Sequence, residues 1–249
     1  MTFTDEYKSD RAVEAHGNTK LHVIHTNDKN QMAITLAQYE CHLSLQRHKI
    51  FDIDLEYDND PEATQKPALC QLSIGKNHPV LLFQMSASER CTVFDNFLVD
   101  PSYTFVGFSI DGDKTRLECV KLEVANFVNI QKEWRVPEAT KPLDSLGVVS
   151  GMLIDDYYNN MKKKITDDEH QRWAILPLSM RHIEYAAKDA YAAYEIWNRI
   201  TLTQDGLRRG SWRRRSPPRS APGAAGDGES LTGEEEDGAG QEPTLPAFF

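Results

Sequence analysis

The stretch KIFDIDLEYDND, residues 49–60, has the pattern of a buried β-strand and also that of an acidic site. Successive side chains of a strand point to opposite faces of its sheet. The apolar face holds Phe51, Ile53 and Leu55. The acidic face holds Asp52, Asp54 and Glu56. Neighbouring carboxylates repel one another unless water or cations separate them. The segment is therefore either an edge strand that carries charge for solubility or a strand that binds cations.

The flanking segments alternate between the periodicities of strand and helix. Apolar runs predict strands at 20–26, 49–57, 68–74, 79–85, 103–109 and 126–131. Helical patterns cover 31–46, 87–98, a segment from about 112, 142–153 and 180–202. The turn-rich GKNH at 75–78 predicts a hairpin between the strands on either side of it. Consecutive strands followed by strand–helix alternation predict an α/β fold with one mixed sheet flanked by helices.

Composition changes near residue 205. Residues 1–19 are an N-terminal extension, residues 20–204 carry the strand and helix patterns, and residues 205–249 form a low-complexity tail that we expect to be disordered. The tail holds 8 of the 14 glycines, and it has too little apolar surface to offset the entropy of folding. Its arginine-rich block at 208–219 is typical of a solvated tail, and also of a nucleic-acid contact or a nuclear address.

Charge and cysteine content narrow the class of protein. The formal net charge of −10 disfavours a broad basic surface, so any binding of nucleic acid must be local or assisted by metal ions. The four cysteines stand singly, without the spacing of a zinc site, which fits a reducing compartment. No stretch approaches the roughly 20 apolar residues of a membrane span, and the N-terminus lacks the apolar core of a signal peptide. We therefore expect an intracellular protein, in the nucleus, the cytoplasm or both.

Two later segments carry further acidic residues. Asp113 follows a predicted strand, at a point where Gly112 would permit a tight turn into a helix, and an aspartate there is often a helix cap. In YAAKDAYAAYEIW, residues 185–197, a rotation of about 100° per residue places an apolar stripe on the core side. Tyr185 and Asp189 then lie together on the free side, where a solvated pair is the ordinary interpretation.

Taken together, the three acidic segments predict a metal site. Carboxylate oxygens that converge from a strand, a helix start and a late helix suit two divalent ions such as Mg²⁺ or Mn²⁺. Two such ions can stabilise both the attacking and the leaving oxygen in the hydrolysis of a phosphodiester.

The set Asp54-x-Glu56, Asp113 and Tyr185-x-x-x-Asp189 resembles the three motifs of the DEDD 3′–5′ exonucleases, in the variant with tyrosine in the third motif. The resemblance covers roughly residues 20 to 202, and it implies a ribonuclease H-like fold. FVGFSIDGDKTRL and RWAILPLSMRHIEYAAKDAYAAYEIWNRI are most similar to the exonuclease domain of the Werner-syndrome protein and its stand-alone plant relatives. Residues 20–204 would then be the exonuclease domain.

The resemblance implies a role for each matching residue. Two Mg²⁺ or Mn²⁺ ions would be held by Asp54, Glu56, Asp113 and Asp189. Asp54 would bind both ions. Tyr185 would orient the attacking water, which fits a phenol whose ordinary pKa near 10 makes it a poor base at neutral pH. Leu55 would lie against the terminal nucleotide.

Two positions depart from the family's pattern. Asp52 stands where a small residue is usual, so it adds negative charge near the metal ligands. Asn129 stands where relatives carry an aspartate outside the catalytic set. Neither departure removes a catalytic residue, and we expect an active enzyme.

The sequence favours a metal-dependent 3′–5′ exonuclease that releases nucleoside 5′-monophosphates from nucleic-acid 3′ ends, with DNA favoured over RNA. An RNA-processing exonuclease similar to ribonuclease D is the second hypothesis, although residues 205–249 are unsuited to form the helical domains of that family. A non-catalytic binding or scaffold protein is the third, and its usual signature would be the loss of a metal ligand.

Overall fold

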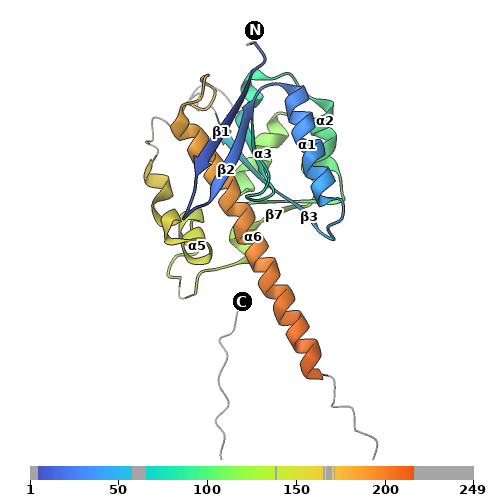
Figure 1. Cartoon of the computed structure of the whole chain (residues 1–249), viewed down its shortest axis with the longest axis vertical. Helices are drawn as coiled ribbons and strands as arrows, with labels where there is room; N and C mark the ends of the chain where they lie inside the picture. The colour runs from blue at the N-terminus through green and yellow to red at the C-terminus, as the bar shows by residue number, and fades with distance from the viewer. Residues whose placement is uncertain are drawn as a thin grey trace, which may run out of the picture. The chain divides into compact units, whose positions relative to one another are not determined.

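The computed structural model describes residues 5–57, 66–137, 139–164, 166, 170 and 172–215, and Figure 1 shows a β-sheet with helices packed around it. The seven strands are β1 (Lys8–Glu14), β2 (Lys20–Thr26), β3 (Lys49–Tyr57), β4 (Pro67–Ser73), β5 (Val80–Phe83), β6 (Tyr103–Gly107) and β7 (Phe127–Asn129). The α-helices are α1 (Lys29–Leu43), α2 (Thr92–Val99), α3 (Asp111–Cys119), α4 (Ile130–Glu133), α5 (Leu146–Leu153) and α6 (Met180–Arg215). The 3₁₀ helices are η1 (Met85–Ala87) and η2 (Asp156–Lys164).

The strands form one mixed sheet in the order β1-β2-β5-β4-β3-β6-β7. Antiparallel pairs join β1 to β2, β5 to β4 and β4 to β3, whereas β2–β5, β3–β6 and β6–β7 are parallel. The predicted α/β class and mixed sheet are therefore confirmed, as is the hairpin, which is β4–β5.

The central position of β3 decides between the two interpretations of its acidic face. This strand pairs with β4 on one side and β6 on the other, so it is an interior strand. The edge-strand interpretation is wrong, because the charges of an interior strand have no sheet edge to protect.

Each face of the sheet has its own apolar core. The apolar side chains of β3 join α1 and α2, which lie next to each other in Figure 1, in one cluster. The other cluster joins α5 and α6 to the opposite face of the sheet. The carboxylates of β3 therefore point toward α6.

Several segments differ from their predicted extents. The strand predicted at 126–131 ends at Asn129, because the Asn129 side chain caps α4, which begins at Ile130. β1 lies in the segment predicted as an N-terminal extension, where its mostly exposed side chains hide the strand periodicity; Val13 is its one buried residue. α6 continues to Arg215, beyond the predicted helix end at 202 and into the predicted tail. The chain divides into two compact units, residues 1–202 and 203–249. Residues 216–249 lie outside the described part of the chain, so the predicted disorder there stays a prediction. Over the helices of the described part, none is both long and apolar enough to span a membrane.

Candidate active site

Three carboxylates meet between the central strand and the last helix. Asp54 and Glu56 from β3 and Asp189 from α6 each offer an oxygen, and these oxygens lie within 4.8 Å of one another. Within the described ranges, this is the only group of three or more His, Cys, Asp or Glu side chains with ligand atoms so close together. Asp54 and Glu56 are half-buried and Asp189 is buried. Carboxylate oxygens are the ligands that hard divalent cations prefer, so the set fits such an ion.

Asp113 lies beside this group but is held by a different neighbour. It occupies the first turn of α3, and its carboxylate accepts a hydrogen bond from the hydroxyl of Tyr57, the residue that follows Glu56 in the sequence. Burial raises the pKa of Asp113, while the Tyr57 hydrogen bond and the charge of Arg116 lower it. The Arg116 guanidinium lies 4.0 Å from the centroid of the Tyr57 ring. The predicted cap role is wrong, because the residue before the helix is Ile110 and no side chain caps it.

The turn into α3 is tight, although not at the predicted glycine. A Cβ at Gly107 would lie 2.7 Å from the carbonyl oxygen of Ile53, so β6 approaches β3 closely at this point. Ser109 lies in the turn with a φ of 66°, and its N–H donates a hydrogen bond to Oδ1 of Asn129. Gly112 lies inside α3 and its φ is not positive. Asn129, the departure noted in the sequence, therefore stabilises the turn that leads to Asp113.

Tyr185 and Asp189 are both buried, with exposed fractions of 7% and 5%. The predicted free face of this helix is therefore wrong: residues 185–193 of α6 are buried on every side. The alanines between them explain this, because small side chains let a helix approach its neighbours from all directions. The rings of His170 and Trp173 have their centroids 5.0 and 6.1 Å from that of Tyr185.

The phenol of Tyr185 stays protonated at neutral pH. Burial raises its pKa most, and the negative charges of Asp189 and Glu56 raise it further. Its hydrogen bond to Asp189 acts in the same direction. Tyr185 can therefore donate a hydrogen bond but cannot serve as a base.

Asp52 is the least solvated acid of the cluster. Its side chain is fully buried on the same strand face as Asp54, and neither carboxylate oxygen has a hydrogen-bond partner within the described structure. Burial raises its pKa well above the usual range, and the charges of Asp54, Asp189 and Asp113 add to the effect.

The other predicted site residue, Leu55, does not join this group. Its side chain is 4% exposed and packs in the apolar cluster of α1 and α2, on the face opposite the carboxylates. A contact between Leu55 and a nucleotide stays a prediction.

Three side chains of the site were missed by the sequence interpretation: Tyr57, Gln71 and Arg116. Gln71 pairs with Asp54 across β3–β4, and its Nε2 lies 3.4 Å from Oε1 of Glu56. A polar residue inside the apolar run ALCQLSI was a signal for it. Tyr57 and Arg116 carried no such signal, because tyrosine ends many strands and arginine is ordinary on an exposed helix.

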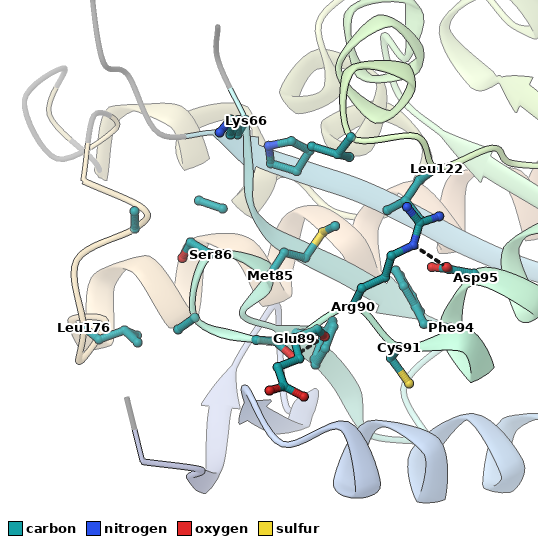
Figure 2. Close-up of a pocket in the computed structure, with 17 residues that line it drawn as sticks. Lys66, Met85, Ser86, Glu89, Arg90, Cys91, Phe94, Asp95, Leu122 and Leu176 are labelled. Atoms are coloured by element: carbon teal, nitrogen blue, oxygen red, sulfur yellow. Dashed lines mark hydrogen bonds and ion pairs between the residues drawn. The ribbon is translucent and has the colours of Figure 1, made fainter. Parts of the chain in front are cut away.

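A cavity of about 780 Å³ is lined by residues of β4, β5, η1 and α2, and the carboxylates of the cluster are not among its lining residues. Pro67, which lines it, pairs with Tyr57 in the sheet. Figure 2 shows Met85 and Phe94 in its apolar wall, Lys66 and Ser86 around it, and Arg90 paired with Asp95. The cavity thus combines apolar surface with a few polar groups, as sites for small organic ligands commonly do.

A mixed sheet flanked by helices has the layout of a ribonuclease H-like fold, and carboxylates gathered on its central strand suit metal-assisted hydrolysis of a phosphodiester. A family model described as 3′-5′ exonuclease matches residues 35–204. The chain belongs to this 3′–5′ exonuclease family and is a nuclease, and enzymes of the family depend on divalent metal ions.

Solved structures with the same fold are distant in sequence. The EXO domain of Aedes aegypti Nibbler is 15% identical with a TM-score of 0.50, over 69% of this chain and 86% of its own. Brucella melitensis NrnC bound to pGG is 18% identical with a TM-score of 0.52, over 69% and 82%. Trypanosoma brucei RNase D in complex with GMP is 16% identical with a TM-score of 0.52, over 68% and 53%. A comparison with curated protein sequences gives no match.

Proposed function

We propose that the protein hydrolyses phosphodiester bonds at nucleic-acid 3′ ends with two bound divalent ions, Mg²⁺ or Mn²⁺, and releases nucleoside 5′-monophosphates. The observation that carries the proposal is the convergence of Asp54, Glu56 and Asp189 oxygens within 4.8 Å. Asp113 would complete the ligand set from α3. Mg²⁺ is bound in a structure of Brucella melitensis NrnC, which is 18% identical to this chain with a TM-score of 0.51 over 69% of this chain and 80% of its own.

The residues of the site would have two roles in hydrolysis: the carboxylates would hold the metal ions, and Tyr185 would orient the attacking water. The bound ions would activate water and stabilise charge on the phosphate. The carboxylates would hold those ions from rigid elements, because β3 is interior and residues 185–193 of α6 are buried. Tyr185, whose one O–H donates to Asp189, would orient the attacking water by accepting a hydrogen bond from it.

The proposed place for the terminal nucleoside is the cavity whose lining residue Pro67 pairs with Tyr57 in the sheet. Phe83, Met85 and Phe94 offer apolar and aromatic surface against which a base of any identity can pack. We expect a nucleoside 5′-monophosphate to inhibit the enzyme by competition. Met85→Trp, which fills the cavity, should weaken that inhibition, and unchanged inhibition would place the nucleoside elsewhere.

Whether the natural substrate is DNA or RNA defines two versions of this function. The similarity of the sequence motifs to the Werner exonuclease domain favours DNA. The neighbours of the fold favour RNA, since two of them are an RNase D in complex with GMP and NrnC bound to pGG. A site that reads the phosphate backbone through metal ions serves either polymer.

One experiment tests the function and separates these versions. Matched DNA and RNA oligonucleotides, single-stranded and 3′-recessed, are incubated with the full chain and Mg²⁺ or Mn²⁺. Stepwise shortening from the 3′ end is expected, and it should disappear in Asp54→Ala, in Asp189→Ala and after chelation of the metal. Binding without shortening under all conditions would support a scaffold, and full activity of Asp189→Ala would overturn the proposed ligand set.

A further inference from the structure

Asp52 is a buried carboxylate for which the fold provides no partner. Its side chain is fully buried, and both oxygens lack a hydrogen-bond partner within the described residues. An ionised group in such a place costs several kcal/mol unless an opposite charge compensates it. Buried polar groups without a partner are uncommon in folded proteins and call for a missing ligand or ion.

The position of Asp52 indicates what that ligand is. Strand alternation puts its side chain on the face of β3 that carries Asp54 and Glu56. Its sheet neighbours in register are Ser73 on β4 and Val106 on β6, neither of which is charged. The charges that act on it are those of Asp54, Asp189 and Asp113, all of them negative. A cation bound among these carboxylates would therefore compensate Asp52 as well.

Charge balance supports the same conclusion. Five carboxylates gather in this region: Asp52, Asp54, Glu56, Asp113 and Asp189. Among the described residues, the cation beside this group is Arg116, whose charge acts on Asp113. Four formal negative charges remain, which two divalent ions neutralise. Without Asp52, the same two ions would leave the centre with an excess positive charge, which a substrate phosphate would have to balance.

We propose that Asp52 is a fifth acidic residue of the metal centre, and that its charge lets the protein bind divalent ions in the absence of nucleic acid. The inference rests on the proposed metal site, and it adds the order in which metal ions and nucleic acid bind to the enzyme. The ions bind first, to a centre that is already charge-balanced, and the nucleic acid binds to the loaded enzyme.

Calorimetric titration of Mn²⁺ into the metal-free full chain, without nucleic acid, tests this inference. Wild type should bind Mn²⁺, and Asp52→Asn should bind it roughly 10- to 100-fold more weakly, the range found when groups that support metal ligands are removed. Asp52→Ser serves as a second variant in case the amide disturbs the fold. Asp10→Asn is the charge-matched control, because Asp10 lies on β1 at the far edge of the sheet and should leave the affinity unchanged.

Thermal unfolding separates a metal role from a structural one. In Asp52→Asn the metal-free protein should melt at the same or a higher temperature, since a buried carboxyl group without a hydrogen-bond partner is gone, while the increase in Tm on adding Mn²⁺ should shrink. A purely structural residue would shift both melting temperatures equally. Equal Mn²⁺ affinity in wild type and Asp52→Asn, or no binding by wild type without nucleic acid, overturns the inference. Binding of Mn²⁺ that depends on Asp52, in a protein that degrades neither DNA nor RNA, would instead contradict the exonuclease proposal alone.

Discussion

Tyr185 shows how burial fixes the role of a single side chain. Its pKa is raised by burial and by the charges of Asp189 and Glu56, so the phenol keeps its proton over the whole physiological range. The same side chain on an exposed helix face would have had no defined orientation. Its ring instead lies against those of His170 and Trp173, and its hydroxyl points at Asp189. A protonated phenol held in this way can accept a hydrogen bond from water and so orient it, but it cannot remove a proton from it.

Tyr185→Phe should therefore slow the chemical step more than it weakens binding. Removal of the hydroxyl leaves the ring packing and all four proposed metal ligands in place. We expect a loss of roughly 100-fold in the single-turnover rate, the size of effect that misplacement of a reacting group produces, with KM changed much less. Rapid-quench measurement on a labelled oligonucleotide checks this. A rate equal to that of wild type would remove Tyr185 from the mechanism.

Buried His25 should make the protein less stable at mildly acidic pH. Burial lowers its pKa, and its Nε2 lies 2.7 Å from the Tyr7 hydroxyl and 3.1 Å from Oε1 of Gln84. Below the ordinary histidine pKa of about 6.5, the unfolded chain takes up a proton that the folded chain refuses. Stability is thus complete above that pH and falls as the pH drops toward the lower folded value.

The decrease in the free energy of unfolding that is attributable to His25 should not exceed about 1.4 kcal/mol per pH unit. Chemical unfolding of wild type and His25→Gln at several values between pH 5.5 and 7.5 isolates it, because the other titrating groups are common to both proteins. The difference in unfolding free energy between the two should narrow as the pH falls. A difference that is independent of pH would contradict a buried neutral histidine.

At the scale of elements, the link from β6 to α3 positions Asp113. Gly107 ends β6 where a Cβ would meet Cγ2 of Ile110 at 2.6 Å and the backbone oxygen of Ile53 at 2.7 Å. The backbone cannot yield without moving β6 away from β3. Gly112, inside α3, would place its Cβ 2.7 Å from the end of the Arg116 side chain, which can rotate away.

Gly107→Ala should accordingly destabilise the protein by about 1–3 kcal/mol and lower the exonuclease rate, because Asp113 would shift with α3. Gly112→Ala is the matched control, and it should be tolerated or slightly stabilising because alanine favours the helix. Thermal unfolding and initial rates compare the two variants. Equal behaviour of the two variants would show that the close approach at Gly107 does not position the site.

Elements were predictable to different degrees, for physical reasons. The bounds of β2 and β3 follow from alternation alone, because each strand has neighbours and a buried face. β1 was missed because a strand at the sheet edge with six of seven side chains outside the core has no apolar period. The helix of Tyr185 was placed correctly, but its burial was not predicted, since an alanine face looks the same whether it meets water or another helix.

The candidate site shows the same limit at finer scale. The carboxylates 54, 56 and 189 could be grouped from motif spacing, and the structure brings them together. Strand alternation placed Leu55 on the apolar face, where it packs, whereas the contact with a nucleotide that its motif implies stays a prediction. The hydrogen bond from Tyr57 to Asp113 joins residues 56 positions apart, which no local pattern encodes.

At the scale of the whole molecule, the two compact units of the chain indicate which C-terminal residues can be deleted without loss of the folded domain. The proposed ligands, Tyr185 and the cavity lined by Met85 all lie within residues 1–202, the first compact unit. The buried apolar residues of the described chain end at Ile200. A chain truncated after Gln204 therefore loses no described core residue. It should melt within about 2 °C of the full chain, as changes outside a core usually do, and it should retain its rate on short oligonucleotides.

Truncation after Glu195 is the contrasting variant, because it removes the buried Ile196 and Ile200 and should lower Tm by far more. A large drop already in the first truncation would show that residues 205–249 contribute to the folded domain, and a rise in KM without such a drop would assign the arginines after Leu207 to nucleic-acid binding.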